Sequence, residues 1–538
     1  MHASPARRLF PFLFWALVVL SLVPLWAFRF FPSQDGPSHL YNAWLLLHLH
    51  DPALPQIAHY YTLNTMPSPN WITHLLLAGL MMVVQPLVAE KVLLSVYLVA
   101  LPLSARYAIA SLRPSAAPLS LLVFPLAYNY FLHMGFYNFV FCLPLFLVTL
   151  GYYLRHGHRL TPGRTAALSG LALLLYFAHL SGLVMVIFAI GLHWPFGVVF
   201  RKARSGATPL RTFVSIFIAF LPSVILTAIF LLRAPQADVN ANISEKMSLM
   251  DRLMFYPFSL VAYAKPDRIY SAAFLAALLG IAVFALRPRR AVRRDWSLPL
   301  ITLAAVLLSF VVPNNISQGG FVFHRVVLFA MLLGILALAA MRWRPLAMLA
   351  IQLVATALTV AGYLLNAGHY RVVNQYLSEL STLGPRINSN HTLLYTESNL
   401  IPQTASGGVI AYPVNPFLHA GCYLALDRGL VEIDNYEAIV GYFPVLFQSQ
   451  LDPPSQRPLP NHNSDTLPPR ITFPPTVPGT VDYVVFFTGG ASIGPTDRNN
   501  ALQRQFETSF TAAGDSTPPS QSIEFNPVAR LYQAKGNP

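Results

Sequence analysis

The feature that most constrains this chain is a series of long apolar runs. A helix of about 20 apolar residues can cross the roughly 30 Å hydrocarbon core of a bilayer. Charged residues make up 10% of the chain and hydrophobic residues 55%, whereas soluble domains carry about 25% charged residues. The sequence therefore predicts a polytopic membrane protein, mainly α-helical. Twelve candidate runs lie near residues 9–28, 72–88, 91–110, 117–131, 136–154, 165–179, 182–200, 212–232, 271–286, 297–312, 322–341 and 345–366.

The net charge of +14 does not indicate nucleic-acid binding, because the basic residues lie in short loops between apolar runs. Such loops tend to stay on the cytoplasmic side of a membrane. If residues 72–88 lie at the interface without crossing, the basic segments 155–164 (RHGHRLTPGR) and 287–294 (RPRRAVRR) both lie inside. We therefore expect eleven spans, with a cytoplasmic N-terminus and an outer C-terminus. Residues 165–200 are expected to form two of these spans, divided at AHLSG (178–182).

The composition changes after residue 366, where short strand-like and helix-like segments alternate. This alternation predicts a small α/β domain. The expected layout is a bundle over residues 1–366, with a first outer loop at 31–90, and an extracytoplasmic domain over 367–538 with a Pro-rich loop at 452–480. The expected strands are HTLLYTE (391–397), GGVIAYPV (407–414), LVEID (430–434), VDYVVFFTGG (481–490) and SIEFNPVARLYQ (522–533). The expected helices are NPFLHAGCYLALDRG (415–429), with Asn415 as N-cap, and RNNALQRQFETSFTAA (498–513).

Acidic residues are scarce in the membrane half, so their positions are informative. Only eight of the 21 Asp and Glu residues precede residue 367, and seven of these eight fall on the expected outer side. No acid lies in the middle of an expected span, which counts against an ion-driven transporter. The polar side chains gather instead in outer loops that could converge on one cavity. These loops carry Asp35 and His39, His133 with FYN (136–138), His179, and NNISQGGFVFHR (314–325).

On these residues the chain resembles the GT-C superfamily of membrane glycosyltransferases, in particular protein O-mannosyltransferases and lipid A aminoarabinose transferases. The matching pieces are the first outer loop SQDGPSHLYNAW (33–44), the interfacial PSPNWITHLLLAGL (67–80) and the order of spans ending in a polar tail. Relatives often carry a second acid at the start of the fourth span, where this chain has Asn138 in FPLAYNYFLHMGFYNFV (124–140). A lone Asp makes a poor site for magnesium or manganese. We therefore predict no cofactor, with a metal ion as an open but disfavoured alternative.

The resemblance implies transfer of a sugar from a polyprenyl-phosphate donor to a glycan, lipid or protein acceptor outside the cytoplasm. It implies that Asp35 is the catalytic base, with His39 as a second catalytic candidate that orients Asp35 or binds the acceptor. Tyr137 and Asn138 are the candidates for lining the acceptor site. Cationic side chains hold the donor phosphate. The candidates are Arg325 and His324, and more weakly Arg252, Lys265 and Arg268.

The sequence leaves other roles open for several of these residues. Asp35 and Ser38 could instead start a surface helix, and Arg325 could anchor the chain at the lipid headgroups. The acidic cluster Glu432, Asp434 and Glu437 either binds a cation or is a solvated face, and we favour the solvated face.

At the level of the whole protein, a lipid or polysaccharide transporter and a catalytically silent assembly subunit remain alternatives to the transferase. The composition, rich in Arg and Pro with few Lys, favours a bacterial inner membrane.

Overall fold

The structure is a computed structural model of the chain. It describes residues 5–200, 209–233, 247–286, 296–315, 320–397, 401–404, 406–448, 481–489, 504, 506–507, 510–517 and 527–535. The expected Pro-rich loop at 452–480 lies outside these residues.

Eight helical segments of the described residues are long and apolar enough to cross a membrane. They are α1 (Pro5–Trp26), α5 (Pro86–Leu112), the 3-10 helix η1 (Pro114–Leu126) continuing into α6 (Tyr130–His133), α7 (Tyr137–His156), α10 (Pro209–Arg233), α13 (Lys265–Leu286), α15 (Val322–Ala339) and α16 (Pro345–Leu380). The other three predicted spans form the helices α8 (Pro162–Ala178), α9 (Leu180–Phe200) and α14 (Ser297–Val311). All eleven predicted spans are therefore helical, and the predicted fold class is confirmed.

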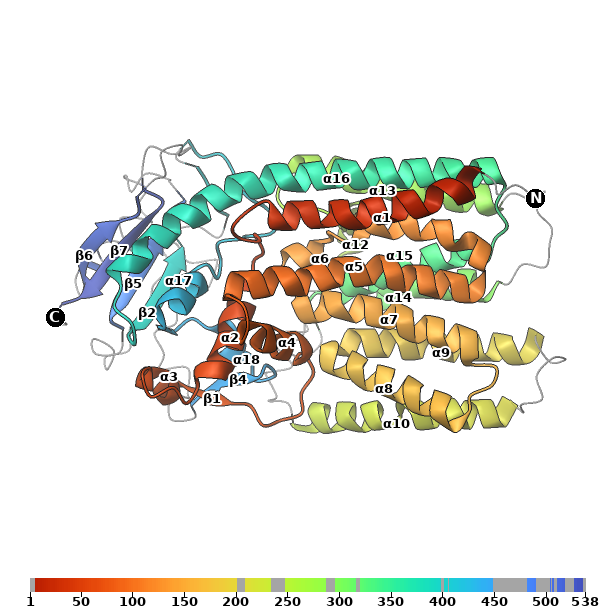
Figure 1. The fold of residues 1–538 in the computed structure, drawn as a ribbon, viewed down its shortest axis with the longest axis horizontal. Coiled ribbons are helices and arrows are strands. Elements are labelled where there is room, and N and C mark those ends of the chain that lie inside the picture. Colours follow the sequence, from red (N-terminus) through yellow and green to blue (C-terminus); the bar gives the residue numbers. More distant parts are fainter. Residues whose placement is uncertain are drawn as a thin grey trace.

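The helices pack side by side into an elongated bundle (Figure 1). Helix α1 begins at one end of the bundle, and the C-terminal strands lie beyond the other end, which we call the domain end (Figure 1). Two further sequence predictions are confirmed. Helix α4 (Ile72–Met81) has 10 residues, so at 1.5 Å per residue it is too short to cross a bilayer. The break between α8 and α9 falls at His179, whose backbone is extended.

The predicted first outer loop lies at the domain end (Figure 1). It contains α2 (Gly36–His48), α3 (Pro55–Tyr60), β1 (Tyr61–Leu63) and α4. Strand β1 pairs antiparallel with β4 (Val445–Phe447), with Tyr61 opposite Phe447. A segment near the N-terminus is thus joined by backbone hydrogen bonds to the C-terminal region.

The C-terminal region contains a five-stranded mixed sheet in the order β3-β2-β5-β7-β6. Strands β3, β2 and β5 are parallel, and β7 pairs antiparallel with both β5 and β6. The strands are β2 (Thr392–Glu397), β3 (Val431–Glu432), β5 (Tyr483–Phe487), β6 (Phe510–Asp515) and β7 (Ala529–Ala534); the short helices are α17 (Gly421–Arg428), α18 (Tyr436–Val440) and η4 (Ser381–Arg386). On the bundle side, α12 (Leu249–Phe255) and η2 (Tyr256–Phe258) precede α13.

Three local predictions for this region are wrong. Residues 407–414 do not join the sheet, because the N–H groups of Tyr412 and Val414 bond to the carbonyls of Tyr263 and Ala262 in the bundle. The helix expected from Asn415 begins only at Gly421, although its stop at Gly429 is as predicted. Residues 510–513, expected to end a helix, belong to β6, where they pair with β7.

The bundle and the C-terminal region share one continuous helix. The last predicted span was expected to end at residue 366, yet α16 runs without interruption to Leu380. Its far end is bonded to the sheet, since Glu379 Oε1 accepts hydrogen bonds from Ser516 Oγ and the Val528 N–H. The change in composition at residue 366 therefore falls inside α16, and this helix continues without a break into the C-terminal region.

Candidate functional site

The backbone around Asp35 is held against the turn between α6 and α7. The Gln34 N–H donates to the His133 carbonyl at 2.9 Å, and the Asp35 N–H donates to the Met134 carbonyl at 3.1 Å. Gly135 has a positive φ, and a Cβ there would lie only 2.5 Å from the Gly36 nitrogen. The close approach requires glycine at this position, and it fixes where Asp35 enters α2.

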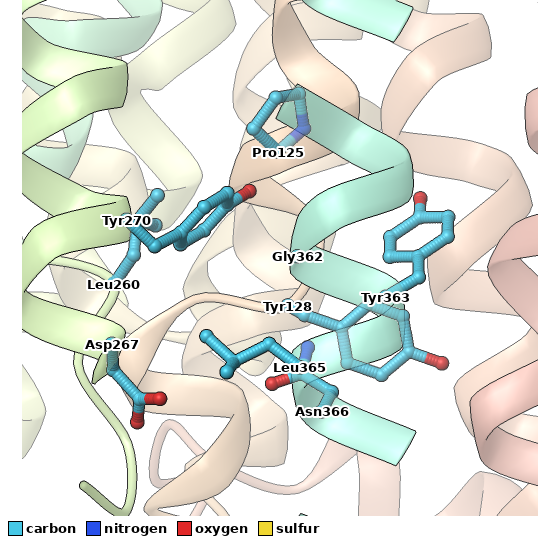
Figure 2. Close-up of a pocket in the computed structure, with 9 residues that line it drawn as sticks. All are labelled: Pro125, Tyr128, Leu260, Asp267, Tyr270, Gly362, Tyr363, Leu365 and Asn366. Atoms are coloured by element: carbon cyan, nitrogen blue, oxygen red, sulfur yellow. The ribbon is translucent and has the colours of Figure 1, made fainter. Parts of the chain in front are cut away.

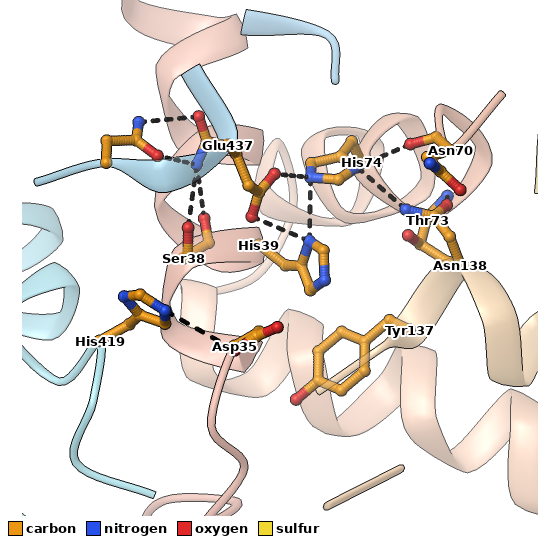
Figure 3. A network of polar contacts seen from close by, with 12 residues as sticks. Asp35, Ser38, His39, Asn70, Thr73, His74, Tyr137, Asn138, His419 and Glu437 are labelled. Carbon is orange, nitrogen blue, oxygen red and sulfur yellow. Dashed lines mark hydrogen bonds and ion pairs between the residues drawn. The ribbon is translucent and has the colours of Figure 1, made fainter. Parts of the chain in front are cut away.

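The side chain of Asp35 does not cap the N-terminus of α2, which argues against the alternative that Asp35 serves only to start a surface helix. Asp35 occupies the N-cap position of α2, but it makes no capping hydrogen bond. It is 5% exposed. One of its oxygens accepts a hydrogen bond from Gln34 Nε2 at 3.2 Å and lies 3.7 Å from His419 Nε2 (Figure 3). The carboxylate is therefore buried and only loosely paired.

Besides Gln34, Asp35 has two partners from the C-terminal region, His419 and Tyr436. The His419 ring stacks on that of Tyr436, with 4.7 Å between the centroids. Burial raises the pKa of Asp35, and the nearby His419 and His39 only partly oppose this rise. A carboxyl group with a raised pKa is suited to accept a proton from a hydroxyl group.

A second, tighter cluster lies beside Asp35 and consists of His39 from α2, His74 from α4 and Glu437 from α18 (Figure 3). His39 Nδ1 lies 3.0 Å from Glu437 Oε1, and His74 Nε2 lies 2.6 Å from Glu437 Oε2. The two ring nitrogens are 3.1 Å apart. The side chains are 3%, 0% and 0% exposed. Within the described residues, this group could hold a metal ion.

The charge state of Glu437 differs from that of Asp35. Burial opposes the charged form, but His39 and His74 outweigh burial and lower the pKa of Glu437 well below its usual range. Burial alone would lower the pKa of His39, yet Glu437 raises it above the usual value. The predicted solvated face at residues 432–437 is therefore wrong, because Glu432 and Glu437 are both buried.

The two predicted acceptor-lining residues are buried and bonded within the protein. The Tyr137 hydroxyl donates to Glu90 Oε1 at 2.6 Å and contacts Ser33 Oγ at 2.9 Å. Asn138 Oδ1 accepts the Thr73 N–H at 3.1 Å, at the start of α4. Asn138 thus fixes α4 and with it His74. An acceptor role for either residue stays a prediction.

Arg325 is the predicted phosphate ligand that packs beside the start of α7, the helix that follows the turn bonded to Asp35. Its guanidinium lies 5.4 Å from the ring centroids of both Phe136 and Phe139, at the start of α7. Its Nε is buried and, among the described residues, has no hydrogen-bond partner.

The other predicted phosphate ligands are less well placed. His324 Nδ1 lies 3.1 Å from Asn314 Oδ1, and its ring packs edge-on against Phe255. Arg252 is buried and donates to the Ser309 carbonyl at 2.6 Å. Lys265 and Arg268 are exposed near the start of α13.

A small pocket lies elsewhere, between η1, α13 and α16 (Figure 2). It has room for about one water molecule. Tyr270 and Asp267 line one side, and Tyr363 and Asn366 line the other. His369 Nε2 pairs with Asp267 at 2.8 Å. None of the lining residues belongs to the network around Asp35, so we do not place the site in this pocket.

Sequence reasoning missed His74, His419, Tyr436 and Glu437 as site residues. His74 stood in the quoted interfacial segment, and Glu437 in the acidic cluster, but no local spacing links them. Glu437 lies 363 positions from His74 along the chain. The available signal was the alternation of acids with apolar residues in VEIDNYE (431–437), which is unusual for a solvated face.

We compared the chain with known protein families, curated proteins and solved structures. No protein-family model matches the chain, and no curated protein matches it. The chain is similar in structure to the arabinofuranosyltransferase AftD from Mycobacteria, with a TM-score of 0.50 and 12% identity, over 99% of this chain and 40% of AftD. It is also similar to ArnT from Cupriavidus metallidurans bound to undecaprenyl phosphate, with a TM-score of 0.51 and 11% identity, over 97% of both chains. The chain shares the fold of these two proteins.

The predicted resemblance is thereby confirmed at the level of the fold, and with eight candidate spans the chain is an integral membrane protein. It spans less than half the length of AftD but nearly the whole length of ArnT.

Proposed function

We propose that this protein is a membrane glycosyltransferase that moves a sugar from a polyprenyl-phosphate donor to an extracytoplasmic acceptor. The observation that carries the proposal is the Asp35 carboxylate, which is buried at the domain end yet makes no capping bond. The similarity to ArnT, whose structure holds undecaprenyl phosphate, supports the class of donor. The proposed setting is a bacterial inner membrane, with the N-terminus cytoplasmic and the domain end outside.

In the proposed reaction, the acceptor hydroxyl attacks the anomeric carbon of the donor sugar. Its proton passes to the Asp35 carboxylate as the new carbon–oxygen bond forms. The bond from the anomeric carbon to the phosphate oxygen breaks, and polyprenyl phosphate leaves with the electron pair. Arg325, whose Nε has no partner among the described residues, stabilises the leaving phosphate. A single displacement inverts the anomeric carbon.

The first experiment measures binding of undecaprenyl phosphate to the purified full chain in nanodiscs. Wild type and Asp35→Asn are expected to bind equally, because Asp35 does not hold the phosphate. Arg325→Gln is expected to bind about tenfold more weakly, through loss of a charge-assisted hydrogen bond. Arg371→Gln is the matched control, because Arg371 is an exposed arginine on α16, and it is expected to bind like wild type. If wild type does not bind, the donor class is wrong.

The second experiment measures transfer from undecaprenyl-phosphate pentoses and hexoses to envelope acceptors. Asp35→Asn is expected to reduce transfer at least about 100-fold while lipid binding is retained. Undiminished transfer by Asp35→Asn would remove Asp35 from the mechanism.

A second candidate, the silent assembly subunit, is favoured by one observation. Asn138 stands where relatives often carry an acid, and its side chain serves α4 instead. Wild type that binds undecaprenyl phosphate but transfers none of the sugars would favour this candidate.

A further inference from the structure

The geometry points to a divalent metal site, with zinc as the preferred ion, formed by His39, His74 and Glu437. We propose that this ion ties the first loop of the chain to the C-terminal region. The inference does not depend on the proposed transferase activity, because it rests on three side chains that the proposed reaction does not use.

The spacing of the four facing atoms, two ring nitrogens and two carboxylate oxygens, is close to that around a bound ion. The two nitrogens are 3.1 Å apart, and they lie 3.0 Å and 2.6 Å from the two oxygens of Glu437. Ligands of a tetrahedral zinc ion with bonds of about 2.0–2.1 Å lie about 3.3 Å from one another. Small side-chain rotations would therefore open the triangle enough to admit an ion.

The outer nitrogens of both rings face backbone carbonyls. His74 Nδ1 lies 3.2 Å from the Asn70 carbonyl oxygen, and His39 hydrogen-bonds the Gly135 carbonyl. A neutral ring that donates its outer N–H to a carbonyl turns the lone pair of its inner nitrogen toward the cluster. Carbonyl bonds of this kind commonly orient histidine ligands of metal ions.

Two inner lone pairs and a carboxylate then face one another in a site closed to water. Such a group is stable only with positive charge at its centre, because buried like-polarity groups repel without solvent screening. A proton can serve one pair of atoms at a time. A divalent cation can satisfy all three at once, including Glu437 Oε1, which faces His39 Nδ1 at 3.0 Å.

The donor set selects the ion. Two imidazoles with one carboxylate suit zinc and other first-row transition metals, whereas magnesium and calcium prefer oxygen ligands. The three ligands come from α2, α4 and α18, which are separate short helices at the domain end. An ion bound by all three closes a chain loop of several hundred residues and so favours the docked arrangement.

The test measures the metal content of the full chain, purified without chelator and in detergent, by inductively coupled plasma mass spectrometry. Wild type is expected to hold about one zinc per chain. Glu437→Gln and His74→Ala are each expected to hold less than about one tenth of that amount. Glu432→Gln is the matched control, because it removes a buried carboxylate from the same segment outside the cluster. It is expected to retain the zinc of wild type.

Cobalt replacement gives a second readout that does not depend on the stability of one variant. Wild type reconstituted with Co²⁺ is expected to show the visible absorption of a tetrahedral N/O site, and Glu437→Gln to lack it. Chelation is expected to lower the thermal midpoint of wild type and to leave that of Glu437→Gln unchanged. Folded wild type that holds no stoichiometric metal, even after incubation with Zn²⁺, would overturn the proposal and leave a protonated histidine–carboxylate cluster.

Discussion

Asp35 and Glu437 lie in one polar network at the domain end, yet their surroundings are opposite. Glu437 contacts two histidines at 2.6 and 3.0 Å, and its pKa is lowered. Asp35 has one histidine at 3.7 Å, and burial raises its pKa. Neighbouring carboxyl groups whose pKa values are pushed apart typically serve different roles. The difference indicates that Glu437 holds the structure together, whereas Asp35 is kept available for chemistry.

The largest expected effect is a difference in protein stability between variants of the two carboxyl groups. Glu437→Ala leaves two buried histidines without their carboxylate, and we expect it to lower the free energy of unfolding by about 3–5 kcal/mol. Asp35→Ala removes a loosely paired carboxyl, so we expect a change within about 1 kcal/mol. Thermal or denaturant unfolding of the full chain in detergent measures both. Equal losses for the two variants would contradict the division of roles.

A second prediction tests how His419 affects Asp35. His419 lowers the pKa of Asp35 against the effect of burial. His419→Gln is therefore expected to raise the pKa of Asp35 further, so that the acidic limb of the pH–rate profile for transfer moves to higher pH. His391→Gln is the control, because His391 pairs with Asp482 at 3.0 Å outside this network. An acidic limb that does not move would show that Asp35 does not control it.

The smallest expected effect concerns a third buried carboxyl, Glu432. Burial and the charge of Asp434 raise its pKa to about 8. A raised pKa in the folded state means that the stability contributed by the protonated carboxyl is complete below the unfolded pKa of 4.5 and is lost as the pH rises from there to about 8. Glu432→Gln cannot ionise, so we expect it to match wild type in stability at about pH 4 and to be more stable than wild type at about pH 9. The measurement is thermal unfolding at both pH values, and a wild type unaffected by alkaline pH would contradict it.

The sequence was sufficient where one physical effect dominates. Hydrophobic length together with the placement of the basic residues located the spans, and the scarcity of acids directed attention to Asp35. It failed where partners come from distant segments. Nothing near GGVIAYPV (407–414) signals that its N–H groups bond to residues 262–263 instead of a strand. Likewise, the burial of Glu437 depends on histidines from α2 and α4. Only the tertiary fold brings these groups together.

The continuity of α16 has a consequence for how this chain can vary. Its 36 residues correspond to about 54 Å of helix, longer than the roughly 30 Å hydrocarbon core. Each residue added to an α-helix advances it by 1.5 Å and turns whatever follows by about 100°. One residue inserted in the middle of α16 would therefore swing His419 and Glu437 away from Asp35 and His74. The number of residues in α16 therefore sets the rotation of the C-terminal region relative to the membrane bundle, and with it the alignment of the residues that each contributes to the site.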